Sequence, residues 1–227
     1  MNRFVLACSG PEEVLAFLPN TGRLQELLVP GAAIGLLPAD RQGKTRWDAQ
    51  IVQHGTGWVI LDNRLTMTLV GQALAAGTLA AWQPYGPWRA EVPCGRHRFD
   101  YAALQGEVQA WLEVKAVNLI IDGVARFPGA PSVRATAHLR QLSTLARAGH
   151  AAGMIFVIGR DDAVACGPHR PMDPAFADAW LDALATGVRL MAQRCTVSPT
   201  GIRLLAEPVP LCVEPGSSDA AQAQQPP

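Results

Sequence analysis

Short apolar runs separated by turn residues fill the N-terminal part of the chain. A short helical turn is predicted over residues 23–28, between the second and third of these runs. In the run over 46–53, apolar and polar side chains alternate, as expected of a strand with one buried face. Short strands at such close spacing are typical of a small β-barrel. The predicted strands cover residues 3–8, 14–18, 32–37, 46–53 and 57–61.

The pattern changes after residue 66. Helical and strand-like segments alternate from there on, which predicts an α/β (α+β) protein. The predicted helices cover residues 69–82, 133–152 and 174–194, and the predicted strands cover 88–92, 97–103, 108–121, 154–158 and 196–205. The run over 108–121 is expected to break near its end. The run over 154–158 is apolar throughout, as in a strand buried on both faces. We therefore expect a barrel domain over 1–66, an α/β domain over 67–212, and a disordered tail over 213–227.

Composition limits the classes of function. The net charge is zero and only 17% of residues are charged, which excludes a histone-like binder, so any nucleic-acid contact must come from a local patch. The five cysteines include no CxxC pair, which argues against a disulfide framework or zinc cluster and favours a reducing cytoplasm. No apolar stretch approaches the ~20 residues of a membrane span, so we expect no membrane partner.

Two acidic residues and a lysine form the chemically most informative pattern. In a strand, Glu113 and Lys115 project from the same face, and Asp100 lies on the preceding predicted strand. Two carboxylates beside a lysine suit metal-assisted phosphodiester cleavage, with Asp100 and Glu113 as ligands of Mg²⁺ or Mn²⁺ and Lys115 positioning the attacking water. Lys115 and Lys44 are the only lysines in a chain with many arginines, which adds weight to Lys115.

A structural interpretation of the same residues stands beside the catalytic one. Glu113 and Lys115 would then be an ordinary same-face ion pair, worth ~0.2–1 kcal/mol. The apolar residues on both sides of the pair indicate a central strand, which favours the catalytic interpretation. An aspartate followed by ExK on adjacent strands is typical of PD-(D/E)XK nucleases, although the spacing alone is a weak signal.

An ordered set of short motifs resembles the sugar fermentation stimulation protein family (SfsA). The matching segments are Arg3-Phe4-Val5, Pro19-Asn20-Thr21-Gly22, Arg98-Phe99-Asp100-Tyr101, Glu113-Val114-Lys115, Phe127-Pro128, His138-Leu139, Gly149-His150-Ala151-Ala152 and Met172-Asp173-Pro174. The resemblance implies an N-terminal OB-like five-stranded barrel followed by a PD-(D/E)XK nuclease-like α/β domain. It also implies DNA binding, with members usually named as DNA or RNA nucleases.

The chain departs from the family at several charged positions. Gln72 stands where the family has the helix glutamate that usually completes such a site, so we include Gln72 among the candidate catalytic residues. Gly129, Val133 and Ala151 replace two acidic residues and an arginine of the family. These losses predict that Mg²⁺ binds weakly.

Further candidates for contact with nucleic acid lie on both predicted domains. Asn20, Thr21 and Arg23 could present a phosphate-binding turn, although an ordinary turn with a helix cap explains the same residues. Lys44 and Arg46 could contact single strands, or belong to a solvated strand edge. Arg98 and Arg134 complete the set. A lone helical histidine, such as His138, is more often structural than a ligand.

Two functions remain open at this point. One is a Mg²⁺-dependent nuclease acting on DNA or RNA through Asp100, Glu113 and Lys115. The alternative is a non-catalytic DNA-binding or regulatory protein on a degenerate nuclease scaffold, which the substitution at Gln72 favours. The sequence leaves the oligomeric state open, a homodimer included.

Overall fold

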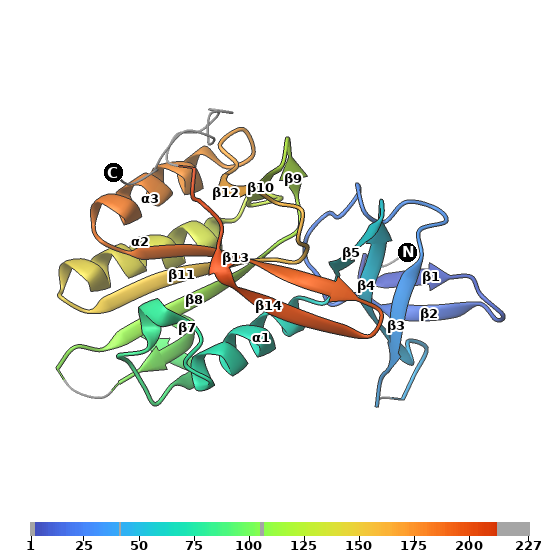
Figure 1. Ribbon diagram of the computed structural model, residues 1–227, viewed down its shortest axis with the longest axis horizontal. Coiled ribbons are helices and arrows are strands. Elements are labelled where there is room, and N and C mark those ends of the chain that lie inside the picture. The colour runs from blue at the N-terminus through green and yellow to red at the C-terminus, as the bar shows by residue number, and fades with distance from the viewer. Residues whose placement is uncertain (1–2, 41, 105–106, 213–227) are drawn as a thin grey trace.

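The computed structural model describes residues 3–40, 42–104 and 107–212, so the tail predicted over 213–227 lies outside the described residues. The chain forms a smaller lobe of strands and a larger lobe in which helices cover a sheet (Figure 1). This arrangement confirms the predicted α+β class. No helix within the described ranges is long and apolar enough to cross a membrane. All five cysteines are free.

The smaller lobe is built on a five-stranded sheet of order β1-β2-β4-β3, with β5 paired to β4. Its strands are β1 (Val5–Cys8), β2 (Val14–Phe17), β3 (Ile34–Pro38), β4 (Trp47–His54) and β5 (Gly57–Ile60), close to the five predicted runs. Their inward side chains, among them Ala16, Ala49 and Val59, form one buried cluster. The segment 23–28 forms the predicted single turn, in which the Leu27 and Leu28 N–H groups donate to the Leu24 carbonyl, and it buries Leu24 and Leu27 against that cluster.

The larger lobe contains a six-stranded mixed sheet of order β14-β13-β11-β8-β7-β6. The strands are β6 (Arg89–Cys94), β7 (His97–Ala103), β8 (Ala110–Val117), β11 (Ala151–Ile158), β13 (Arg189–Ser198) and β14 (Gly201–Pro208). A small second sheet, not predicted, pairs β9 (Ile120–Ile121), β10 (Val124–Phe127) and β12 (Ala165–Pro168). The predicted strand over 108–121 is broken near its end, as expected, and its last residues belong to this second sheet.

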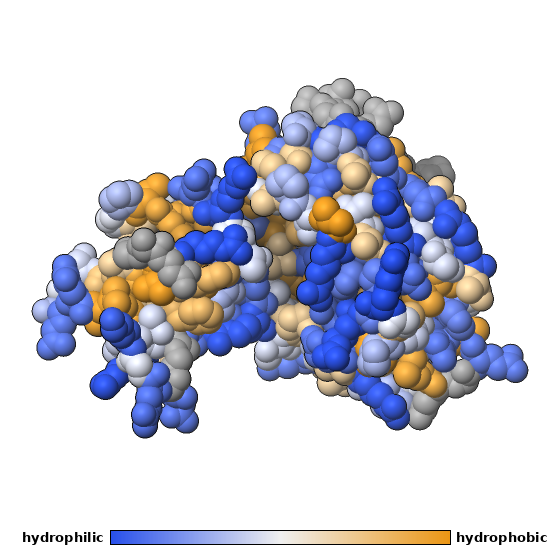
Figure 2. Space-filling view, turned by 180° about the vertical axis from the view of Figure 1, so that it is seen from behind, coloured by the Kyte–Doolittle hydropathy of each residue, from blue (hydrophilic) through white to orange (hydrophobic). Residues whose placement is uncertain are grey.

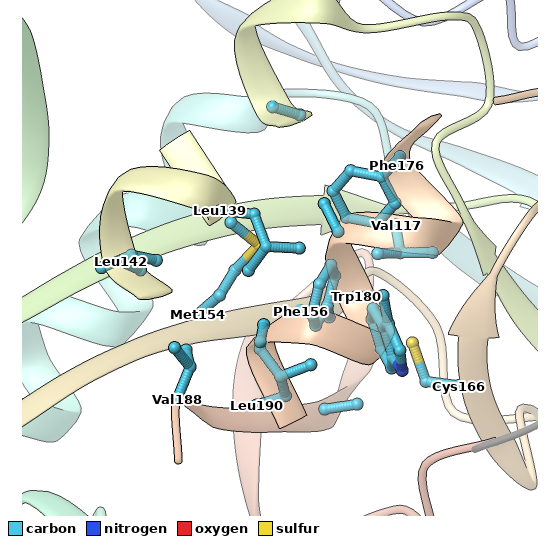
Figure 3. Packing of buried hydrophobic residues seen from close by; sticks show 14 of the residues in the cluster. Val117, Leu139, Leu142, Met154, Phe156, Cys166, Phe176, Trp180, Val188 and Leu190 are labelled. Atoms are coloured by element: carbon cyan, nitrogen blue, oxygen red, sulfur yellow. The ribbon is translucent and has the colours of Figure 1, made fainter. Parts of the chain in front are cut away.

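The central strand β11 is buried on both faces, as predicted. Met154 and Phe156 pack under the helices α2 (Val133–Arg147) and α3 (Pro174–Ala185), with Leu139 and Trp180 around them (Figure 3). Ile155 faces the opposite side, in the cluster beneath α1 (Asn63–Ala75) and the short 3-10 helix η1 (Ala80–Trp82). The helices therefore form a layer on each side of the sheet.

Helix boundaries differ from the predictions because caps and glycines set them. α1 starts earlier than predicted, since the Asp62 side chain accepts a hydrogen bond from the Arg64 N–H. α2 and α3 end earlier than predicted, since Gly149 and Gly187 adopt positive φ and turn the chain into β11 and β13. The predicted strand over 196–205 is in fact the hairpin that joins β13 to β14.

Candidate active site

Strand β8 carries Glu113 and Lys115 on its α2 side. Trp111 and Val117 of the same strand pack in the core beneath α2 and α3, whereas Leu112 packs in the core beneath α1. The two faces therefore alternate as a strand requires, and the predicted shared face of Glu113 and Lys115 is confirmed.

Strand β7 brings Asp100 to the same place at an irregularity of the sheet. The β6–β7 register pairs Ala90 with Tyr101 and Val92 with Phe99 but skips Glu91 and Asp100, and Glu91 has a φ of 56°. Asp100 Oδ2 instead accepts a hydrogen bond of 2.6 Å from the Val114 N–H. The Asp100 carboxylate is thereby held against the peptide that follows Glu113.

Glu113 is buried, and its two oxygens have different surroundings. Oε1 lies 2.5 Å from Lys115 Nζ and 2.6 Å from His138 Nδ1. Oε2 is buried and has no hydrogen-bond partner among the described residues. Burial by itself raises the pKa of Glu113, but the bond with His138 and the positive charge of Lys115 outweigh it and lower the pKa overall. Glu113 is therefore ionised at neutral pH.

The pKa of Asp100 is shifted in the opposite direction, upward. Burial and the nearby charge of Glu113 raise the pKa of Asp100 to about 6, although the Val114 N–H and Lys115 partly offset them. Two carboxylates with diverging pKa values in one place are characteristic of functional sites.

The site opens into a cleft of about 720 Å³ between the two lobes. A hollow between the lobes is visible in the space-filling view (Figure 2). The cleft is lined by the turn 20–24, the start of α1, β8, and the segment 126–135 that leads into α2. Its basic side chains are Arg3, Arg23, Lys115, Arg126 and Arg134, against the acidic Glu26, Asp100 and Glu113. A chain without net charge thus concentrates positive charge around its buried carboxylates.

Asn20 holds its turn to the segment that leads from the smaller lobe into α1. Asn20 Nδ2 donates to the Leu61 carbonyl at 2.8 Å and to Asn63 Oδ1 at 2.9 Å, and Asn20 Oδ1 accepts from the Gly22 N–H. The Asn20 side chain is therefore occupied in holding the turn to the start of α1. Thr21 and Arg23, which follow it, line the cleft.

Some of the predicted residues lie elsewhere. Lys44 and Arg46 are exposed just before β4 and do not line the cleft, and Arg98 lines a neighbouring pocket. Gln72 is exposed on α1, a helix that packs on the face of the sheet opposite Glu113. The expectation that Gln72 faces the metal is not met, because Thr66 and Met67, nearer the start of α1, line the cleft instead.

Sequence reasoning missed two residues of this site. The sequence favours a structural role for His138, whereas the structure shows its ring hydrogen-bonded to Glu113 of the site. Its spacing of four residues from Arg134, which puts both on one face of α2, could have pointed to it. No sequence pattern pointed to Arg126 as a site residue, because the strand β10 that places it in the cleft was not predicted.

Comparisons with known proteins agree with this two-lobed architecture. Residues 1–61 match the model of the SfsA N-terminal OB domain, and residues 64–201 match that of the sugar fermentation stimulation protein RE domain. The chain is therefore a two-domain protein in which an OB domain is followed by an RE domain. The chain belongs to the sugar fermentation stimulation protein (SfsA) family.

Individual relatives cover most of the chain. The sugar fermentation stimulation protein homolog of Moorella thermoacetica is 40% identical over 210 residues, which is 90% of each chain. That of Chloroflexus aggregans is 41% identical over 201 residues, 88% of this chain and 77% of the relative. The structure of Pyrococcus furiosus SfsA in complex with Ca²⁺ superposes with a TM-score of 0.84 at 26% identity, covering 92% of this chain and 91% of that one.

Proposed function

We propose that the chain is a metal-dependent phosphodiesterase that acts on DNA or RNA. The observation that carries the proposal is that Asp100, Glu113 and Lys115, from adjacent strands, all open into one cleft lined with basic side chains. Carboxylates beside a lysine suit phosphodiester hydrolysis, and the arginines suit a polyanionic strand.

A divalent cation fits these residues. Glu113 Oε2 is a buried oxygen without a hydrogen-bond donor, and the Glu113 charge raises the pKa of Asp100, so both carboxylates would gain from a shared cation. The Pyrococcus furiosus relative was solved with Ca²⁺, an ion that prefers oxygen ligands. We infer that Asp100 and Glu113 hold Mg²⁺ or Mn²⁺. Binding is weak, because no group of three or more His, Cys, Asp or Glu side chains suited to a metal occurs among residues 3–40, 42–104 and 107–212.

Lys115 and two arginines of the cleft would position the attacking water and bind the phosphate. The bond to Glu113 fixes the Lys115 ammonium in the cleft, where it orients the attacking water and offsets charge on the phosphate. Arg126 and Arg134, which line the same cleft, would hold the phosphate. A bound divalent cation would supply polarisation of the phosphate and a lower pKa for a coordinated water.

A cleavage assay tests the proposal. Labelled single- and double-stranded DNA and RNA are incubated with wild type, Glu113→Gln, Lys115→Gln and the control Arg140→Gln, with Mg²⁺, Mn²⁺ or EDTA. Arg140 is exposed on α2 and lines neither pocket, so its variant also removes one positive charge but should cleave like wild type. We expect a loss of at least about 100-fold in both site variants, and no cleavage in EDTA.

Among the described residues, no third His, Cys, Asp or Glu joins Asp100 and Glu113 in a metal-binding group. This favours a second candidate function, a nucleic-acid-binding protein without catalysis. A wild type that binds strands but cleaves none with either metal would overturn the nuclease and leave this candidate. Cleavage that survives in Glu113→Gln would overturn the assigned site.

A further inference from the structure

A second pocket adjoins the candidate active site. It has a volume of about 470 Å³ and lies between the β6–β7 turn and α2. Its lining residues are Pro93, Gly95, Arg96, His97, Arg98, Arg134, Ala137 and His138. No acidic residue is in this lining, whereas three arginines are, so the pocket is strongly basic.

The positive charge of this pocket is largely uncompensated. Arg98 has one acidic neighbour, Glu91, at 3.8 Å, and both side chains are well exposed, which makes the pair weak. Within the part of the chain that the structure describes, Arg96 and Arg134 make no ion pair. Arg96 Nε instead lies 3.4 Å from His97 Nε2. Arginines gathered without carboxylates are typical of sites for anions.

Two residues connect this pocket to the active site. Arg134 lines both the pocket and the interlobe cleft. His138 lines the pocket and is hydrogen-bonded through Nδ1 to Glu113 Oε1. The His97 ring packs edge-on against the His138 ring, with centroids 5.4 Å apart. The pocket and the cleft therefore meet at Arg134, so one bound strand can contact both.

We propose that this pocket binds a second phosphate group of the nucleic-acid strand, next to the phosphate that is cleaved. The inference rests on the proposed function, since it takes the occupant of the cleft to be a nucleic acid. A guanidinium binds phosphate oxygens through two parallel N–H bonds, and Arg96, Arg98 and Arg134 supply such groups from two different elements. The group bound is either an internal phosphate of the strand or its terminal phosphate.

Binding measured in EDTA tests the pocket without any need for cleavage. The affinity for a 12-nucleotide single strand, labelled at its 3′ end and carrying a 5′-phosphate or a 5′-hydroxyl, is followed by fluorescence anisotropy over a range of salt. The variants are Arg96→Gln/Arg98→Gln and the matched control Arg89→Gln/Arg140→Gln. The control residues are exposed and line neither pocket, and they lie on β6 and α2, the strand before the pocket turn and the helix that carries Arg134. Circular dichroism verifies that both variants are folded.

We expect the pocket variant to bind about tenfold more weakly than the control, and its salt slope to be shallower by about 1, as expected for the loss of one or two phosphate contacts on a single strand. Equal losses on both strands identify an internal phosphate, and a loss confined to the 5′-phosphorylated strand identifies a terminal one. The phosphate-binding proposal is overturned if the pocket variant binds as tightly as the control, or if the wild type binds neither strand. Failure of the nuclease proposal is separate, since it appears as intact binding without cleavage in Mg²⁺ or Mn²⁺.

Discussion

Replacing Asp100 with asparagine should make the protein more stable at neutral pH. The Asp100 carboxylate is partly buried beside the ionised Glu113, and these surroundings raise its pKa from 3.8 to about 6. A raised pKa means that the folded state disfavours the charged form. Asparagine has a similar shape, can still accept the hydrogen bond from the Val114 N–H, and carries no charge.

The magnitude follows from linkage between protonation and folding. One pKa unit corresponds to about 1.4 kcal/mol, so ionised Asp100 lowers the free energy of unfolding by about 3 kcal/mol above pH 6. Between pH 6 and 4 the folded state takes up the proton first, and the penalty declines. It vanishes below the unfolded pKa, near 3.8. Asp100→Asn should thus exceed wild type by about 2–3 kcal/mol at pH 8 and by less than about 1 kcal/mol at pH 4.

Urea unfolding followed by tryptophan fluorescence in EDTA at pH 4, 5, 6 and 8 measures this difference. Asp161→Asn is the control, because Asp161 is exposed and should show no such trend. A difference between Asp100→Asn and wild type that stays constant with pH, or that grows toward low pH, would refute the argument from burial and the Glu113 charge. Added Mg²⁺ should stabilise wild type more than Asp100→Asn, since only wild type retains both carboxylates.

Other substitutions test separate parts of the structure. Gln72→Glu should leave cleavage within about twofold of wild type, because Gln72 lies outside the cleft; a large gain in the cleavage assay would contradict the placement. Asn20→Ala should lower the free energy of unfolding by about 2–3 kcal/mol in urea, since it removes a buried hydrogen bond to the Leu61 carbonyl and a second bond to Asn63 at the start of α1; an unchanged midpoint would count against that role. Gly153→Ala should lower the thermal midpoint by the equivalent of at least about 2 kcal/mol, because the added Cβ would lie 2.3 Å from the Trp82 ring and 2.7 Å from the Arg189 carbonyl; full stability would contradict this packing. His138→Phe should lower cleavage at least about tenfold, because the Glu113 carboxylate loses one of its two hydrogen bonds and keeps only that from Lys115; unchanged cleavage would contradict this positioning role.

Local pattern determined much of the fold. The alternation along β8 was sufficient to put Glu113 and Lys115 on one face, because side-chain direction in a strand follows from backbone geometry alone. The apolar run within β11 was sufficient to predict burial on both faces. The short apolar runs of the first lobe likewise predicted its strands, since each run spans one strand between turn residues.

Tertiary structure decided what depends on contacts between distant segments. The face of the sheet that α1 covers cannot be read from the α1 sequence, and it puts Gln72 outside the cleft. The bond between His138 and Glu113 joins residues 25 positions apart. It exists because α2 packs against the face of β8 that carries Glu113. The pKa of Asp100 likewise depends on burial and on a neighbour from another strand, which no local pattern encodes.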